Sequence, residues 1–217
     1  TGALHLSLLS LGIGHGDEVI ISDLTFGATA SAVVAVGARP VLLDIDPGTW
    51  GLDKGKIFSY LCKKTRAIIP THLYGEDAGE FKQFGIPVIE DACESLGMVP
   101  IHGHMACYSF YGNKPITTGE GGMLCGEFGN AKAWRDGGFD KNYRNILPGL
   151  NYRMSNMQAA VGLAQLERFD ELISKRLKNA SLYASLLPGK GKWLFVLQCK
   201  KPIEMAGFLK EREIETR

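Results

Sequence analysis

The chain has 217 residues, of which 45% are hydrophobic and 22% charged, enough to bury one full-sized core. Lys and Arg number 24 and Asp and Glu 23, so no overall charge would draw the chain to nucleic acid or to an anionic membrane. No apolar run approaches the roughly 20 residues that span a bilayer, and the first residues lack a signal-peptide pattern. Five cysteines without a CxxC pair indicate reduced thiols, so we expect a cytoplasmic protein.

Short β-branched runs alternate with helix-forming segments along the first half of the chain. The runs predict buried strands at Glu18–Ser22, Pro40–Asp46, Arg66–Pro70, Pro87–Asp91, Cys107–Tyr111 and Gly122–Cys125. The segments between the early runs predict helices at Ala3–Leu11, Ala28–Val36, Lys54–Lys63 and Ala78–Phe84. Alternation of strand and helix is typical of an α/β fold with a mostly parallel sheet.

The last third of the chain has a different pattern. Apolar residues at helical spacing predict one long connecting helix from Asn156 to about Leu187, closed by Pro188 and Gly189. After it, Trp193–Gln198 predicts a strand and Pro202–Glu213 a helix. We therefore expect a large domain over residues 1–188, including the connecting helix, and part of a small C-terminal α+β domain over residues 189–217.

One lysine, Lys114, stands in a glycine-rich stretch directly after the fifth expected strand. Desolvation beside backbone turns can hold a lysine amine partly neutral, which is the form that attacks an aldehyde and makes a Schiff base. On composition alone, a solvated surface lysine is the commoner case. The surrounding motif decides between the two interpretations.

Ser109, Lys114 and Thr118–Gly122 resemble the lysine segment of the DegT/DnrJ/EryC1/StrS family of sugar aminotransferases. The resemblance implies an α/β fold, the large domain of fold type I of the pyridoxal-phosphate enzymes, with a mostly parallel sheet of the seven-stranded type flanked by helices. It also implies that pyridoxal 5'-phosphate is bound as a Schiff base on Lys114. The same resemblance continues in family order through Thr1–Leu6, Gly14–Ile20, Leu24–Phe26, Pro70–Gly75, Val88–Gly97 and Leu150–Ala160.

The resemblance assigns further residues to the cofactor ring. Asp91, at the end of a buried strand, would hold the pyridine nitrogen protonated and so strengthen the ring as an electron sink. Glu94 would lie near the ring hydroxyl, and Phe26 would stack on the ring face. The alternatives are a turn or helix-cap role for Asp91, solvent exposure for Glu94 and core packing for Phe26.

The phosphate of the cofactor needs hydroxyls and backbone N–H groups at a helix start. Thr1, Gly2 and Ser109 match the family positions for this contact. Asn151 and Arg153 resemble the segment that in relatives crosses to the neighbouring subunit and touches its cofactor phosphate, which implies a homodimer with shared active sites. The alternatives are a helix cap for Asn151 and a surface or ion-paired side chain for Arg153.

The reaction that the resemblance implies moves an amino group from an amino acid, by analogy L-glutamate, to a nucleotide-linked keto-sugar, a 4-keto-6-deoxyhexose in the most similar members. Lys114 and Asp91 would be its catalytic residues. Relatives with His in place of the lysine perform dehydration, so Lys114 favours transamination.

Two stretches of the chain leave other functions open. Glu76–Pro87 and Gly97–Cys107 look shortened against the family, so a cofactor-binding, regulatory or dimerising relative without turnover is an alternative, and so is a sugar dehydratase. His102 and His104 lack supporting metal ligands, and we expect no metal site.

Overall fold

The computed structural model of the chain describes residues 1–216. Its centre is a parallel strand group in the order β2-β1-β3, formed by Arg39–Leu43, Glu18–Ser22 and Thr65–Ile69. A second group follows in the order β4-β5-β6, formed by Ile89–Asp91, Met105–Ser109 and Gly122–Gly126. Parallel bridges from Ile68 to Val88 and from Thr71 to Asp91 join the two groups, so the six strands follow one another as a continuous sheet.

All pairings of this sheet are parallel except that of β5 with β6, which is antiparallel. The expected mostly parallel α/β fold is therefore confirmed, and within residues 1–216 this sheet has six strands. Strand β1 lies between β2 and β3, and all five of its residues are buried. This burial is the reason for the unbroken apolar run at Val19–Ile21, because both faces of an inner parallel strand are covered.

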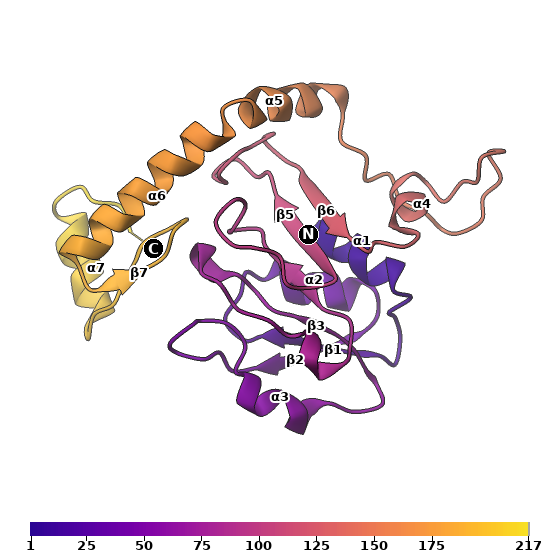
Figure 1. The fold of residues 1–217 in the computed structure, drawn as a ribbon, viewed down its shortest axis with the longest axis horizontal. Helices are drawn as coiled ribbons and strands as arrows, with labels where there is room; N and C mark the ends of the chain where they lie inside the picture. The colour runs from indigo at the N-terminus through magenta and orange to yellow at the C-terminus, as the bar shows by residue number, and fades with distance from the viewer. Residues whose placement is uncertain (217) are drawn as a thin grey trace.

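Two hydrophobic clusters cover the two faces of the sheet. Helices α1 (Gly2–Ser10) and α2 (Ala28–Ala35) pack on one face, where Leu4, Leu8 and Val33 meet strand residues such as Val19 and Ile21. The other face is covered by α3 (Lys54–Tyr60) and by the segment that leads to β4. Figure 1 shows strands β1 to β3 between α3 on one side and helices α1 and α2 on the other.

The helix expected at Ala78–Phe84 is wrong, since only a short 3₁₀ turn, Lys82–Phe84, forms there. Gly79 has a positive φ of 80°, which interrupts a right-handed helix, and the backbone N–H of Ala78 bonds to the ring of His72 instead of a helical carbonyl. Phe81 and Phe84 are nevertheless buried in the second cluster. The apolar spacing that suggests a helix is thus met by one tight turn.

The single long helix expected from Asn156 to Leu187 is broken into two. Helix α5 covers Asn156–Leu166 and begins with a capping box from Ser155 and Gln158, while α6 covers Phe169–Leu186. At the break, the ring of Phe169 packs against Gly97, where a Cβ would lie only 2.5 Å from the ring. Figure 1 shows the two helices as a bent rod along one side of the sheet. The bend lets the start of α6 contact the body of the domain.

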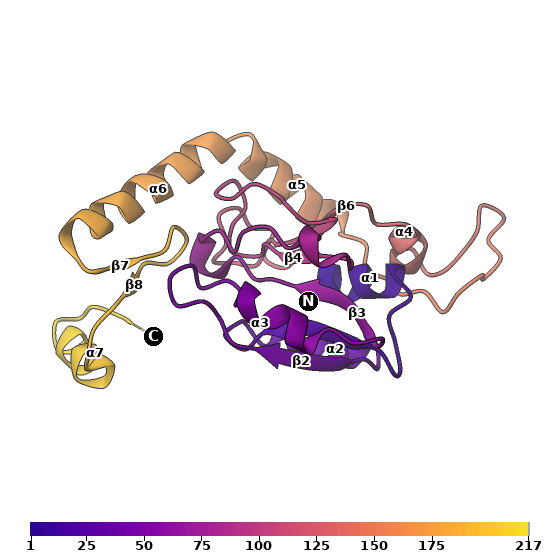
Figure 2. The same cartoon turned by 60° about the horizontal axis from the view of Figure 1, so that its bottom comes forward.

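Smaller elements complete the chain. Helix α4 (Ala131–Arg135) lies at the end of the molecule opposite to the C-terminal part (Figures 1 and 2). The strand expected at Trp193–Gln198 is reduced to β8 (Val196–Leu197), paired with β7 (Gly189–Lys190), and α7 covers Pro202–Lys210. In the part of the chain that the structure describes, no helix combines the length and apolar character that crossing a membrane requires.

Candidate active site

The candidate residues gather at the carboxyl ends of the parallel strands. Asp91 ends β4 and is paired in register with Cys107 of β5, so Ser109 ends β5 two residues further on. Phe26 follows β1, and Lys114 follows β5. Open α/β sheets bind ligands at this edge because the loops there face one another. The sheet order therefore explains how residues far apart in the sequence share one site.

Asp91 is the most enclosed charged group of the site, with 5% of its surface exposed. The hydroxyl of Thr29 donates a 2.6 Å hydrogen bond to its Oδ2, and the backbone N–H of Cys93 donates a 3.3 Å bond to Oδ1. Hydroxyls of Thr25 and Thr71 extend the network at 3.0 Å. No ion pair among residues 1–216 includes Asp91.

A buried carboxylate without a basic partner is energetically costly. The protonated ring nitrogen of the implied cofactor would supply the missing positive charge, so the donor set around Asp91 fits that group. The turn role that the sequence left open is present, because the N–H of Cys93 bonds to one carboxylate oxygen while the Thr29 hydroxyl bonds to the other.

Lys114 and Glu94 form the second part of the site. The Nζ atom of Lys114 lies 3.6 Å from Oε1 of Glu94, and only 11% of the lysine side chain and 13% of the glutamate side chain are exposed. Burial raises the pKa of Glu94, although the N–H of Tyr74 and the Lys114 ammonium oppose the shift. Neither side chain is the solvated surface residue that composition alone suggests. Lys114 is thus held in an enclosed setting suited to amine chemistry.

Tyr74 holds Glu94 in place through an unusual backbone conformation. Its φ and ψ are 55° and 20°, a left-handed geometry that is uncommon outside glycine. In this conformation its N–H donates a 2.7 Å hydrogen bond to Oε2 of Glu94. Its carbonyl accepts 2.8 Å bonds from the N–H groups of Lys192 and Trp193. Local strain of this kind is often found at functional sites.

Trp193 covers the amine of Lys114 and was not indicated by the sequence. The Nζ atom lies 3.8 Å from the centroid of the indole ring, a cation–π contact. The indole N–H donates a 3.2 Å bond to the carbonyl of Asn113, which fixes the ring over the lysine loop. Trp193 begins a short apolar run, a sequence pattern that predicts a core residue. Nothing in the sequence around it therefore indicates its contact with Lys114.

The proposed phosphate contacts lie at the same edge. Helix α1 runs along β5, with Ser10 against Met105 and Ser7 against Cys107, so its first turn points toward Ser109. No side chain caps that first turn, which leaves its N–H groups free to bind an anion. Thr1 and Gly2 stand at this helix start, and the Ser109 hydroxyl accepts only a 3.3 Å bond from Tyr111.

Phe26 and Asn151 are the most exposed of the candidates. Phe26 leaves 76% of its surface exposed, so it is not a core residue within residues 1–216, and a planar group could stack on its ring. Asn151 is exposed and forms an antiparallel bridge with Asp136. The next residue, Tyr152, reaches α1, where its hydroxyl lies 3.1 Å from Nδ1 of His5.

Arg153 is also exposed, and one guanidinium nitrogen donates a long 3.4 Å bond to the carbonyl of Asp136. His102 and His104 serve the loop before β5, where Nδ1 of His104 accepts a bond from the N–H of Val88. Within residues 1–216, no group of three or more His, Cys, Asp and Glu side chains is arranged to hold a metal ion.

A buried pair, His72 and Glu90, supports the site from the opposite side of Asp91. Oε1 of Glu90 accepts bonds of 2.9 and 2.7 Å from the N–H groups of His102 and Gly103. Its Oε2 lies 3.3 Å from Nε2 of His72 in a poorly aligned contact, and neither atom has another partner within residues 1–216. The N–H of His72 bonds to the carbonyl of Asp91. Through these bonds, His72 and Glu90 hold the backbone of β4 in place at Asp91.

Comparison with known proteins identifies the family to which the chain belongs. The model of the DegT/DnrJ/EryC1/StrS aminotransferase family matches residues 1–215. The chain belongs to this family. It is 44% identical over 209 residues to the GDP-perosamine synthase of Caulobacter vibrioides, a match that covers 88% of this chain and 56% of that protein.

Two further members extend the comparison. The UDP-2-acetamido-2-deoxy-3-oxo-D-glucuronate aminotransferase of Pseudomonas aeruginosa is 40% identical, over 84% of this chain and 56% of that protein. The crystal structure of NtdA from Bacillus subtilis with its bound cofactor PMP superposes with a TM-score of 0.88 at 30% identity, over 97% of this chain and 56% of that one. The fold is therefore that of the sugar aminotransferases, and the chain spans about half the length of the curated relatives it matches.

Proposed function

We propose that this chain carries the cofactor site of a sugar aminotransferase, with pyridoxal 5'-phosphate bound covalently to Lys114. The observation that carries the proposal is the pairing of two enclosed groups at one sheet edge: the Lys114 amine beside Glu94, and the Asp91 carboxylate without a basic partner. Family members support it, since the NtdA structure holds PMP and another solved member is described in its PLP form.

Each residue has a defined task in this proposal. When bound, the cofactor would supply an electron sink for the electron pair that stays on the donor α-carbon when its proton is removed. The Lys114 amine takes that proton and returns it, a role that requires its neutral form in an enclosed site. Asp91 would keep the pyridine nitrogen protonated, Glu94 would lie near the ring hydroxyl, and Phe26 would cover one ring face.

The phosphate group would be held by Thr1, Gly2 and Ser109 together with Asn151 of the partner subunit, in a homodimer. Exposure of Asn151, with no side-chain partner within residues 1–216, supports an intermolecular role. Residues 1–188 would then form the large domain and residues 189–217 part of a small one. The figures support that division, because the segment after α6 lies to one side of the sheet.

The donor would be L-glutamate and the acceptor a nucleotide-linked keto-sugar. Relatives named GDP-perosamine synthase and UDP-2-acetamido-2-deoxy-3-oxo-D-glucuronate aminotransferase support this class of acceptor. Within it, the similarity to perosamine synthases favours a 4-keto-6-deoxyhexose. Such a product would enter surface polysaccharide, including lipopolysaccharide, from the cytoplasm.

Absorption spectroscopy tests the proposal directly. The purified chain is mixed with pyridoxal phosphate and reduced with borohydride, and the adduct is mapped by mass spectrometry. We expect a single adduct on Lys114, which Lys114→Ala abolishes while Lys132→Ala, a change in the α4 segment, leaves it intact. An adduct elsewhere, or none, overturns the cofactor assignment. Addition of glutamate before reduction then separates an enzyme, whose spectrum shifts toward the amine form, from a cofactor-binding module, whose spectrum is unchanged.

A further inference from the structure

Three threonine hydroxyls stand behind the Asp91 carboxylate. Thr29 lies in the first turn of α2, Thr25 precedes that helix, and Thr71 follows β3 and is bridged to Asp91. The Thr29 hydroxyl lies 2.6 Å from Oδ2 of Asp91, and the Thr25 hydroxyl lies 3.0 Å from those of Thr29 and Thr71. The exposed fractions of Thr29, Thr71 and Asp91 are 0%, 4% and 5%. The four side chains therefore form one enclosed series of hydrogen bonds from Thr71 to Asp91.

The direction of this series follows from the number of protons that each group carries. A hydroxyl carries one proton and an ionised carboxylate carries none, so Thr29 is the donor to Asp91. The proton of Thr29 is then used, and Thr25 must donate the bond between Thr25 and Thr29. By the same count, Thr71 donates to Thr25. All three protons therefore point toward Asp91, and hydrogen bonds aligned in this way strengthen one another in a buried setting.

The groups around Asp91 leave it free to accept a further bond. Burial, followed by the negative charge of Asp91, raises the pKa of the Cys93 and Cys107 thiols, so both stay protonated near neutral pH. The third titratable neighbour, Glu94, is another acid and carries no positive charge. Within residues 1–216, Oδ1 of Asp91 accepts one bond, the 3.3 Å bond from the N–H of Cys93. A carboxylate can accept about four bonds, so capacity remains for a donor such as a protonated ring nitrogen.

We propose that Thr71, Thr25 and Thr29 form a hydroxyl relay that positions Asp91 for the pyridine nitrogen of the cofactor. Thr29 is the positioning residue in direct contact with Asp91, and the other two hydroxyls act through it. The assignment rests on the proposed function, because the ring nitrogen is the group that Asp91 would meet. Thr25 directly precedes Phe26, so one short segment would carry both the relay and the side chain that covers a ring face.

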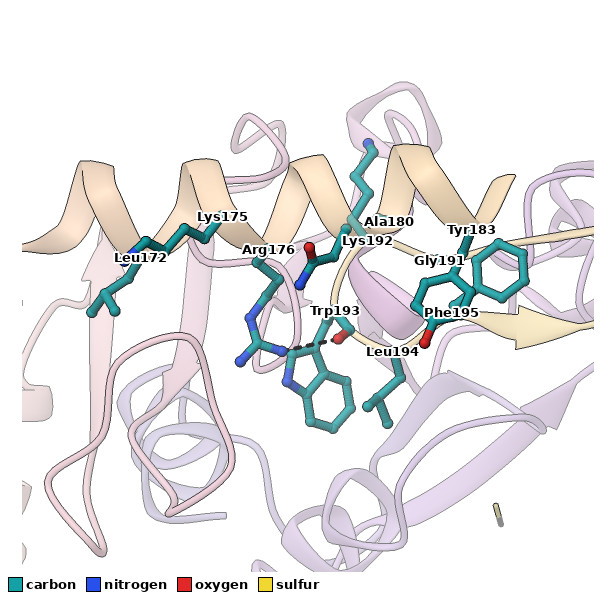
Figure 3. A pocket seen from close by; sticks show the side chains of 11 residues that line it. Leu172, Lys175, Arg176, Ala180, Tyr183, Gly191, Lys192, Trp193, Leu194 and Phe195 are labelled. Atoms are coloured by element: carbon teal, nitrogen blue, oxygen red, sulfur yellow. Dashed lines mark hydrogen bonds between the residues drawn. The ribbon is translucent and has the colours of Figure 1, made fainter. Parts of the chain in front are cut away.

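The hydroxyl relay is separate from the pocket that Figure 3 shows. That pocket, of about 430 Å³, lies between α6 and the hairpin residues around Trp193. Its lining includes neither Asp91 nor any of the three threonines. A change in a relay hydroxyl is therefore expected to act on Asp91 without altering that pocket.

Titration of the full chain with pyridoxal phosphate, followed by absorption, tests the relay. Thr29→Val keeps a similar shape but removes the proton donor, so we expect the cofactor to bind about 3-fold to 10-fold more weakly, less than for loss of a direct charged hydrogen bond. A ring nitrogen that is less firmly protonated withdraws less charge from the Schiff base on Lys114. The midpoint of the spectral pH titration of that Schiff base should therefore rise. Thr29→Ser restores the hydroxyl and should restore both measurements.

The order of the effects separates a relay from simple packing. The relay predicts effects that decline from Thr29→Val through Thr25→Val to Thr71→Val, because each hydroxyl is one bond further from Asp91. Burial alone predicts a larger effect for Thr71→Val than for Thr25→Val, since Thr71 is buried and Thr25 is half-buried. If Thr29→Val does not fold, the comparison of Thr25→Val with Thr71→Val decides between the two.

The matched control is Thr65→Val, which removes another buried hydroxyl, one that bonds to the N–H of Cys62 at the opposite end of β3. It should leave the cofactor affinity and the spectral midpoint unchanged. If the wild-type chain forms the Lys114 adduct, the relay alone is overturned by equal results for Thr29→Val and the control, by failure of Thr29→Ser to restore them, or by the burial order. Absence of the adduct in the wild-type chain refutes the proposed function, and the relay with it.

Discussion

Replacement of Glu90 provides a strong test of the support beneath the active site. Glu90 is fully buried and accepts hydrogen bonds from two backbone N–H groups, those of His102 and Gly103. Glu90→Ala leaves both of these donors without an acceptor. Each buried unsatisfied donor costs about 1–3 kcal/mol, so we expect the loss of two acceptor bonds to lower the free energy of unfolding by about 2–6 kcal/mol. Domains are typically stable by only about 5–15 kcal/mol, so the effect is large.

A conservative variant separates the hydrogen bonds from the contact with His72. Glu90→Gln keeps an oxygen for the two N–H groups but turns an amide NH₂ toward Nε2 of His72. The ring cannot accept there without changing tautomer, because its Nδ1 already accepts a 3.1 Å bond from the N–H of Ala78. We therefore expect a smaller loss, about 1–2 kcal/mol.

Urea unfolding of the cofactor-free chain, at one protein concentration for all variants, measures these differences. The control is Glu127→Ala, an exposed change that should alter the free energy of unfolding by less than about 0.5 kcal/mol. A loss below about 1 kcal/mol for Glu90→Ala would refute the assignment of Glu90 as a structural acceptor. So would equal losses for the alanine and glutamine variants.

Three further predictions concern the site and the thiols. Burial raises the pKa of Glu94, so the folded chain binds this proton more tightly than the unfolded chain; its contribution to stability is greatest below the ordinary pKa of 4.5 and is lost as pH rises through the folded-state value. Glu94→Gln should therefore gain stability relative to wild type from about pH 4.5 to about pH 7 in urea titrations, and a constant difference would contradict this. Thr29→Val removes the 2.6 Å bond to Asp91 and should lower the free energy of unfolding by about 1–3 kcal/mol in the same assay, whereas an unchanged midpoint would show that the bond is dispensable. Burial raises the pKa of the Cys107 thiol, so a thiol reagent should label exposed Cys62 in the native chain and Cys107 only after unfolding; equal labelling rates would be inconsistent with this core.

Much of the fold could be predicted because its signal is local. The six strand runs correspond to β1 to β6 with boundary shifts of a few residues, since buried parallel strands are short, apolar and bounded by turn residues. Helices α1, α2 and α3 were predicted because helical spacing and helix-forming composition are also local signals. The prediction was wrong where the same spacing of apolar residues can be buried either by a helix or by a tight turn. Around Phe81 the burial was predicted correctly, but Gly79 forces a turn in place of a helix.

The site divides in the same way. Lys114 and Asp91 were predicted from the resemblance of the glycine-rich segment and of the strand end to the family, and Gly119 of that segment adopts a positive φ of 77°. Parallel strands then bring their carboxyl ends to one edge, so the sequence by itself determined that the two residues lie at one site.

Only the tertiary structure decided what surrounds them. The Thr29 bond to Asp91 spans 62 positions of the sequence, and the contact of Trp193 with Lys114 depends on how the hairpin after α6 returns to the sheet. The break between α5 and α6 also depends on a distant residue, because the ring of Phe169 needs the space left by Gly97. Periodicity and motifs report what each segment favours locally, whereas burial, partners and pKa shifts arise from neighbours that only the folded chain brings together.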